Sequence, residues 1–352
     1  PFPRLMQEMD DLGMEFSAES HNNIYNMKMK CLASDQEAAF DIFRDILLQP
    51  AIEEQWIERV KMLLLTRVFP NQSVQATEIA QRVLRNTLYQ NHPYRRQRFG
   101  TPDTVKGFTA AQVREVYEKF TRPNNCVIAV YGDIDPEKTE ALLRKTLGGW
   151  EKGEIPKSFS VDEPLLTEPV DVELTNRQVR VNYRVAWRAI SRQEKEDRHA
   201  LSVMGTIIGA TGWLHARLRE GSAEYVYSVY GRPYTGDRAG HYFIETDFSP
   251  KDEKEVLAII DGVVADIRAG KFTDEELETA KKMILCYDAL GKKENANVVS
   301  GDAMSEMYGE GYDSDKLHYE RIRNVTREDV VRVSKAIFDS PALRILVRPK
   351  AP

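Results

Sequence analysis

Cysteine is scarce in this chain. Cys31, Cys126 and Cys286 are the three cysteines among 352 residues; they lie far apart, and none belongs to a C-x-x-C pair. An odd number of widely spaced cysteines argues against a disulfide framework and against a cysteine-based metal site. We expect all three to be small, buried apolar residues.

Long apolar runs and blocks of one charge are missing as well. No stretch approaches the roughly 18–20 apolar residues of a membrane-spanning helix. The 49 Lys and Arg and the 55 Asp and Glu are scattered, which argues against a nucleic-acid-binding surface. With 42% hydrophobic residues the composition is typical of a soluble globular protein. The sequence leaves the compartment unknown, and the periplasm or cytoplasm of a bacterium is expected.

The familiar catalytic motifs are absent too. None of the six histidines has another within five residues, so neither H-E-x-x-H nor H-x-x-E-H occurs. The chain also lacks G-x-x-x-x-G-K-[ST], G-x-G-x-x-G and G-x-S-x-G. We therefore assign no catalytic residue and no metal ligand to this chain.

What the chain does have is an internal duplication. Residues 108–131 resemble 325–348: in each copy a capping Thr, Thr109 or Thr326, precedes an amphipathic helix, a Pro-containing turn and an apolar strand. Upstream, residues 27–47 match 242–264, and the two segments are separated by the same number of residues as the first pair. Two long copies indicate two domains of one fold.

The copies set the predicted domain boundaries. The first domain covers 1–150, a polar linker covers 151–169, and the second domain covers 170–352. The first copy lacks a counterpart of 171–211 and the chain opens PFPRLMQEMDD, so we expect an upstream segment to be missing.

Strands are predicted at 170–174, 179–187, 225–230 and 242–248, each followed by helical sequence. Strand pairs that alternate with helix pairs predict an α+β fold. In each domain a mainly antiparallel sheet carries helices on one face.

One segment, 213–230 (WLHARLREGSAEYVYSVY), allows two interpretations. Arg219 suits the end of a helix, and Tyr225 suits the start of a strand, so both residues fit an ordinary structural role. The same two residues flank a short turn and could instead contact a substrate.

Four segments together resemble the insulinase/pitrilysin family, zinc peptidases with the inverted motif H-x-x-E-H. They are LGMEFSAESHNNIYNMKMKCLASDQEAAFDIFRDILLQP, LYQNHPYRRQRFGTPDTVKGFTAAQVREVYEKFTRPNNCVIAVYGDID, GWLHARLREGSAEYVYSVY and GKFTDEELETAKKMIL. The resemblance implies two halves, fused or separate, that close around a peptide chamber. One half binds zinc through two His and a later Glu, and the peptide adds as a strand to a sheet edge.

The chain departs from this family in its metal ligands. The inverted motif is absent, and the window for the later Glu reads Leu65-Thr66-Arg67-Val68, without a carboxylate. The resemblance therefore implies no cofactor in this chain, with zinc expected in a partner half or in a missing upstream segment.

The family's substrate-binding Arg and Tyr map onto Arg219 and Tyr225, one residue closer together than in the family. Tyr227, next on the same strand face, is the alternative to Tyr225. This pair is expected to hold the peptide backbone and to support a developing oxyanion.

Three functions follow from the resemblance. The first is a zinc-less half or subunit that supplies chamber wall and the Arg219/Tyr225 pair to a zinc-bearing homologous half or, in a homodimer, to a second copy. The second is a fragment of an active zinc peptidase whose motif lies upstream of Pro1. The third is a structural or assembly subunit without a catalytic role. The expected partners are the other half and a peptide, with no nucleic acid and no membrane span.

Overall fold

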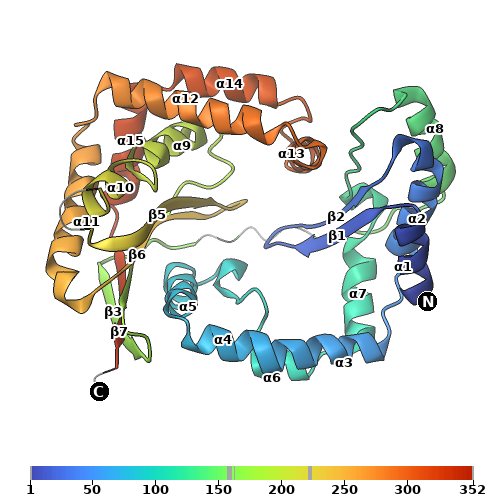
Figure 1. The fold of residues 1–352 in the computed structure, drawn as a ribbon, viewed down its shortest axis with the longest axis horizontal. Coiled ribbons are helices and arrows are strands. Elements are labelled where there is room, and N and C mark those ends of the chain that lie inside the picture. Colours follow the sequence, from blue (N-terminus) through green and yellow to red (C-terminus); the bar gives the residue numbers. More distant parts are fainter. Residues whose placement is uncertain (1, 157–160, 162, 221–223, 351–352) are drawn as a thin grey trace. The chain divides into compact units, whose positions relative to one another are not determined.

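Two β-sheets and a series of helices make up the described chain (Figure 1). The computed structural model describes residues 2–156, 161, 163–220 and 224–350. The strands are β1 (Glu15–Ser20), β2 (Tyr25–Lys30), β3 (Val170–Asn176), β4 (Val181–Ala189), β5 (Val226–Thr235), β6 (Gly240–Phe248) and β7 (Leu343–Pro349).

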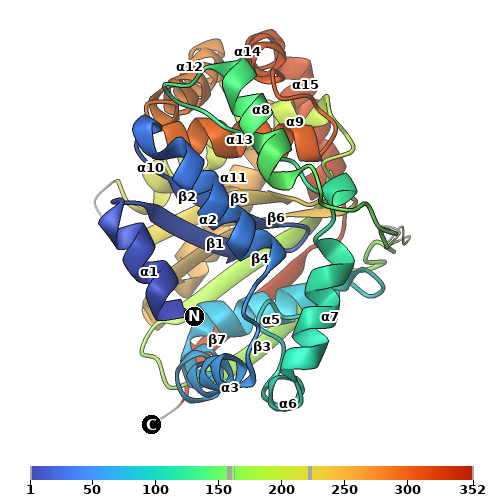
Figure 2. The ribbon, with the colours of Figure 1, turned by 90° about the vertical axis from the view of Figure 1, so that its right-hand side faces the viewer.

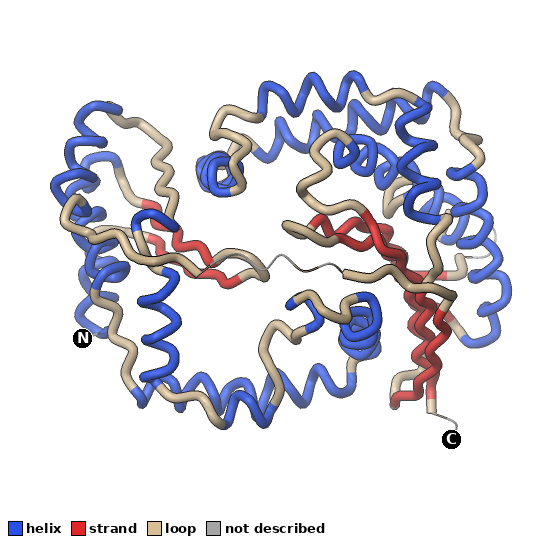
Figure 3. Tube along the Cα trace, turned by 180° about the vertical axis from the view of Figure 1, so that it is seen from behind, coloured by secondary structure: helices blue, strands red, loops and turns tan. Residues whose placement is uncertain are grey.

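The helices lie between these strands and can be followed in Figure 3, where they are blue and the strands red. The α-helices are α1 (Phe2–Asp11), α2 (Gln36–Leu48), α3 (Glu54–Leu63), α4 (Phe69–Val74), α5 (Ala76–Leu88), α6 (Pro102–Lys106), α7 (Ala110–Phe120), α8 (Pro136–Leu147), α9 (Asp197–Ile208), α10 (Trp213–Leu218), α11 (Glu253–Arg268), α12 (Asp274–Gly291), α13 (Asn295–Met307), α14 (Asp315–Asn324) and α15 (Arg327–Phe338). Short 3₁₀ turns are η1 (Ala33–Asp35), η3 (Pro93–Arg95), η4 (Pro123–Asn125) and η5 (Pro250–Asp252), and η2 (Leu64–Val68) is π-helical.

Packing divides the chain into two compact units, each built from three segments. Unit 1 comprises Pro1–Leu65, Thr101–Ser158 and Ala289–Asp315, and unit 2 comprises Thr66–Gly100, Phe159–Asp288 and Lys316–Pro352. These units describe which segments pack together. The two homologous domains, 1–150 and 170–352, and the linker 151–169 stay a prediction from the internal duplication in the sequence.

Unit 2 is organised around a five-stranded sheet in the order β3-β7-β4-β6-β5 (Figure 2). The pairs β4–β7, β4–β6 and β5–β6 are antiparallel, whereas β3 and β7 are parallel. All four strands predicted in this part of the chain are present as β3, β4, β5 and β6. The α+β class and the mainly antiparallel sheet are therefore confirmed.

Helices cover both faces of this sheet, to different extents. Side chains alternate along β4, so Val181, Tyr183, Val185 and Trp187 enter the larger core, to which α9, α11 and α15 contribute. On the second face, α5 packs its buried residues Ala76, Ala80, Leu84 and Leu88 against β7. The prediction named one covered face, and α5 adds partial cover to the other.

Unit 1 contains a smaller sheet, in which β1 and β2 form a hairpin with Glu15 opposite Lys30 and Ser20 opposite Tyr25. The strand predicted at 126–131 is wrong, because no strand is formed there. In the described residues β1 and β2 pair with each other alone.

The predicted caps and cysteines had different outcomes. Thr109 and Thr326 each close a capping box at the start of α7 and α15, as the sequence predicted. Cys31 and Cys126 are half-buried and Cys286 is exposed, so the expectation of three buried cysteines is wrong. Cys286 lies in α12.

Candidate functional site

The turn that carries Arg219 connects α10 to the edge strand β5. The backbone N–H groups of Arg219 and Glu220 both donate to the carbonyl of His215, at 2.9 and 3.2 Å, which ends the helix. The N–H of Tyr225 donates to the carbonyl of Leu218 at 3.0 Å. Residues 221–223, the centre of the turn, lie outside the described residues.

The two predicted residues have different surroundings. Arg219 is exposed, whereas Tyr225 is half-buried and packs against the larger core. The guanidinium of Arg219 lies 5.6 Å from the ring centroid of Tyr227, which is 79% exposed. The structure therefore brings Arg219 together with Tyr227, the alternative, and records no contact between Arg219 and Tyr225 among the described residues.

A β-bulge explains why Tyr227 points away from the core. Val226 lies opposite Phe248 and Val229 opposite Thr246, so β5 has one residue more than β6 over this interval. Both valines are buried. The extra residue allows two apolar side chains three positions apart to reach the same core and turns Tyr227 outward.

β5 is an edge strand. It pairs with β6 on one side, and in the described part of the chain no strand pairs with its other side. Its exposed side chains include Tyr230, whose ring lies 4.7 Å from the guanidinium of Arg232. An unpaired edge of this kind can accept an additional strand, and the side chains beside it combine aromatic and positive character.

The second face of the sheet also carries buried polar residues beside α5. Arg184 on β4 forms an ion pair with Glu245 on β6, at 2.7 Å between Nη2 and Oε2, and both side chains are buried. Arg184 Nη1 also donates to the side-chain oxygen of Gln81 on α5 at 2.5 Å. Asn182 donates to both Glu245 and Asp247. These residues were not identified from the sequence.

Beside this ion pair lies a group of aromatic residues from α5, η3, β5 and β6. The Tyr89 hydroxyl and His241 Nδ1 are hydrogen-bonded at 2.6 Å, and Tyr234 stacks on His241 with ring centroids 5.1 Å apart. Burial lowers the pKa of His241 to about 3, and the charges of Arg184, Arg85 and Arg188 act in the same direction. His241 is therefore neutral near pH 7.

The window that aligns with the family's later Glu has an unusual backbone. Leu64–Val68 is π-helical and lies between α3 and α4. A π-helical turn contains one residue more per turn than the surrounding α-helix, so it re-aims the side chains around it. Leu, Leu, Thr, Arg and Val offer no carboxylate here. Over residues 2–156, 161, 163–220 and 224–350 there is no group of three or more His, Cys, Asp or Glu arranged for a metal ion.

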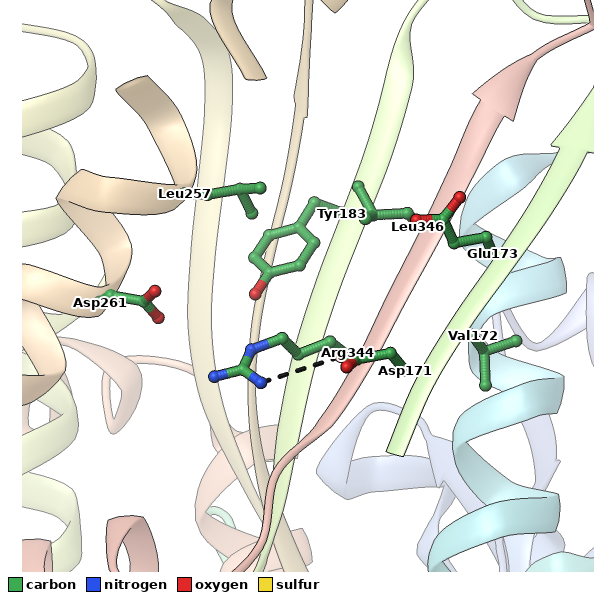
Figure 4. A pocket seen from close by; sticks show the side chains of 8 residues that line it. All are labelled: Asp171, Val172, Glu173, Tyr183, Leu257, Asp261, Arg344 and Leu346. Carbon is green, nitrogen blue, oxygen red and sulfur yellow. Dashed lines mark ion pairs between the residues drawn. The ribbon is translucent and has the colours of Figure 1, made fainter. Parts of the chain in front are cut away.

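A cavity of about 200 Å³ opens on the α11 side of the sheet, near the edge strand β3 (Figure 4). Arg344 pairs with Asp171 at 3.8 Å, and Asp261 from α11 contributes a second carboxylate. Burial is the main cause that raises the pKa of Tyr183 in its wall. This cavity lies on the opposite face of the sheet from Arg184 and His241.

Comparisons with known proteins identify the family. Residues 3–102 match the family model described as Insulinase (Peptidase family M16), and residues 107–284 match the one described as Peptidase M16 inactive domain. The chain belongs to the insulinase family, peptidase family M16, and half of it corresponds to the inactive domain of that family.

Individual relatives agree with this placement. The chain is 24% identical over 360 residues to an uncharacterised zinc protease of Streptomyces coelicolor, covering 96% of this chain and 75% of the relative. A crystal structure of a peptidase M16 inactive domain from Pseudomonas fluorescens superposes with a TM-score of 0.88 at 20% identity, over 99% of this chain and 83% of that one. The periplasmic protease PqqL from Escherichia coli gives a TM-score of 0.79 at 14% identity, over 99% of this chain and 39% of that one. In the described residues no helix is long and apolar enough to cross a membrane.

Proposed function

We propose that this chain is the zinc-less half, or subunit, of an insulinase-family peptidase. It closes a peptide chamber together with a zinc-bearing homologous half and holds the substrate with Arg219 and Tyr227, the alternative to the predicted Tyr225. The observation that carries the proposal is the exposed Arg219–Tyr227 pair beside the open edge of β5. A peptide added to that edge would have its backbone held by ladder hydrogen bonds and its carbonyls within reach of a cation.

The ligand window supports the zinc-less role. A zinc site in this family needs an acidic oxygen from the helix that follows α3, and Leu64–Val68 supplies none. Arg67 would also add a positive charge near a metal ion. The match of residues 107–284 to an inactive domain points the same way.

The choice of partner rests on chain length. This chain corresponds to 39% of the PqqL chain, so that protein contains more than twice the length of the present fold. A second half of similar size, on the same chain, on a separate homologous subunit or in a homodimer, would complete the chamber.

Peptide binding tests the Arg219 assignment. A fluorescein-labelled random-coil peptide is titrated with the purified protein and followed by fluorescence anisotropy. Arg219→Ala is expected to weaken binding about tenfold, which corresponds to about 1.4 kcal/mol. Tyr227→Ala should weaken binding similarly, and Tyr225→Phe should leave it unchanged, because Tyr225 packs into the core.

The matched control is Arg217→Ala, which removes an arginine from the last turn of α10, two residues before Arg219. Arg217 pairs with Asp266 at 2.8 Å and stacks on Trp213, so its side chain is engaged in contacts within the protein. Equal binding by the wild-type protein and Arg219→Ala would contradict the substrate-holding role. Stoichiometric zinc in the full-length protein, measured by elemental analysis, would overturn the zinc-less role.

A further inference from the structure

Two arginines project from the same face of β4, and their surroundings differ sharply. Arg184 and Arg188 are four residues apart, on the face that β4 turns toward α5. Arg184 has a carboxylate, an amide oxygen and the ring of Phe243 as partners. Its charge is compensated by Glu245, although its buried Nε has no hydrogen-bond partner among the described residues.

Arg188 has no such compensation. Its guanidinium lies 4.9 Å from the ring centroid of Tyr89. Nε and Nη1 are buried, and neither has a hydrogen-bond partner within the described residues. The side chain is half-buried, so part of it still reaches the surface. A desolvated cation without a counter-charge is unfavourable unless a partner is supplied from outside.

The groups around Arg188 do not supply that partner. His241 lies directly opposite Arg188 in the β4–β6 register and is neutral near pH 7. Glu163 and Asp237 act on the neighbouring His92 together with Arg188. Glu163 accepts the backbone N–H groups of Gln90, Asn91 and His92, and Asp237 accepts the side-chain amide of Gln193 at 2.8 Å.

Three tyrosines form the apolar surroundings of Arg188 and His241. Tyr89, Tyr94 and Tyr234 are within ring-contact distance of one another or of His241, and the ring of Tyr89 lies against the guanidinium of Arg188. In a site with little water, a charge-assisted hydrogen bond to an anion is stronger than at an open surface. Gly236 is adjacent, and a Cβ there would come within 2.4 Å of the Tyr94 ring, so the loop after β5 requires glycine to close over this group.

The geometry points to Arg188 as the anchor of a carboxylate-binding site on the polar face of the unit 2 sheet. The ligand class is a peptide that carries a carboxylate, either its free C-terminus or an acidic side chain. This inference rests on the proposed function, since it specifies which peptides the chamber wall would retain. Tyr234, which is half-buried, would lie beside the bound carboxylate, and Arg188 would neutralise it.

Three labelled peptides of the same apolar sequence separate the possibilities. The first has a free C-terminus and no acidic residue, the second is C-terminally amidated, and the third is amidated and contains one internal Glu. Anisotropy titrations at low salt should show the amidated peptide about tenfold weaker than at least one of the two carboxylate-bearing peptides. Which of the two binds more tightly identifies the source of the carboxylate.

Variants connect this preference to Arg188. Arg188→Gln should abolish it and bring all three peptides to the affinity of the amidated one. Arg177→Gln removes an exposed arginine that precedes the same strand and should leave the preference intact. Because Arg188→Gln removes an uncompensated charge, its melting temperature without peptide should be equal to or above that of the wild type.

The outcomes also distinguish this inference from the proposed function. Equal affinities for the three peptides, unchanged in Arg188→Gln, would overturn the carboxylate site and leave peptide binding by the chamber wall intact. A large loss of thermal stability in Arg188→Gln would overturn it as well, because it would assign Arg188 a structural role. Absence of binding by every peptide would overturn both.

Discussion

The buried ion pair between Arg184 and Glu245 allows a prediction with a definite magnitude. Arg184 is 4% exposed and Glu245 11% exposed, and their closest side-chain atoms are 2.7 Å apart. Glu245→Gln keeps the size of the side chain and removes its charge. The guanidinium then stays buried with a neutral amide in place of its counter-ion, so the free energy of unfolding should fall by about 3–5 kcal/mol.

A surface pair on the same sheet provides the control. Arg344 and Asp171 are 3.8 Å apart, with side chains 40% and 69% exposed. Water screens this interaction, so Asp171→Asn should cost less than about 1 kcal/mol. The double variant Arg184→Met with Glu245→Leu should be close to neutral, because it removes both buried charges at once.

Urea denaturation followed by tryptophan fluorescence measures these differences, since Trp187 is buried in the larger core and contacts Phe338. The two single variants at positions 184 and 245 should together cost at least about 3 kcal/mol more than the double variant. The reasoning would be refuted if Glu245→Gln cost no more than Asp171→Asn, or if the double variant were as unstable as the single ones added together.

Two further predictions concern protonation and backbone space. The pKa of His241 is lowered to about 3 from 6.5, so as the pH falls the unfolded chain binds this proton before the folded chain does. Between about pH 6.5 and 3 the free energy of unfolding should therefore fall by up to about 1.4 kcal/mol per pH unit. In urea titrations of His241→Phe, the free energy of unfolding should fall less steeply with pH, and an unchanged dependence on pH would contradict this origin. A Cβ at Gly212 would lie 2.0 Å from the carbonyl oxygen of Ile207, but one at Gly262 in α11 would meet nothing within 4 Å. Gly212→Ala should therefore lower the free energy of unfolding, and Gly262→Ala should raise it by up to about 1 kcal/mol. Urea denaturation measures both changes, and the reverse order would contradict the packing around α10.

Local patterns were sufficient to locate several of the elements. The alternation in 179–187 predicted β4, and the Thr caps predicted the starts of α7 and α15. These signals depend on neighbours within a few residues, so they are legible in one sequence. The strand expected at 126–131 failed for the opposite reason, because a strand exists only where another strand pairs with it.

The polar face of the sheet could not be predicted in the same way. Asn182, Arg184 and Arg188 alternate with apolar residues, which is also the pattern of a strand with one face in water. The burial of Arg184 depends on Gln81 and α5, which are about a hundred residues away in the sequence. Only the fold reveals that one arginine of this strand is paired and the other is not.

The bulge in β5 changes how the spacing of Arg219 and its tyrosine should be interpreted. Counted along the chain, Tyr225 falls one residue short of the family spacing and Tyr227 one residue beyond it. In space, the extra residue between Val226 and Val229 shortens the rise of the strand relative to β6 and turns Tyr227 to the exposed side. The turn is one residue shorter than in the family, whereas the bulge adds one residue to β5 relative to β6. The two changes therefore have opposite effects on how far along the strand a tyrosine lies from Arg219. The position of a tyrosine beside Arg219 therefore depends on the strand pairing as well as on the spacing along the sequence.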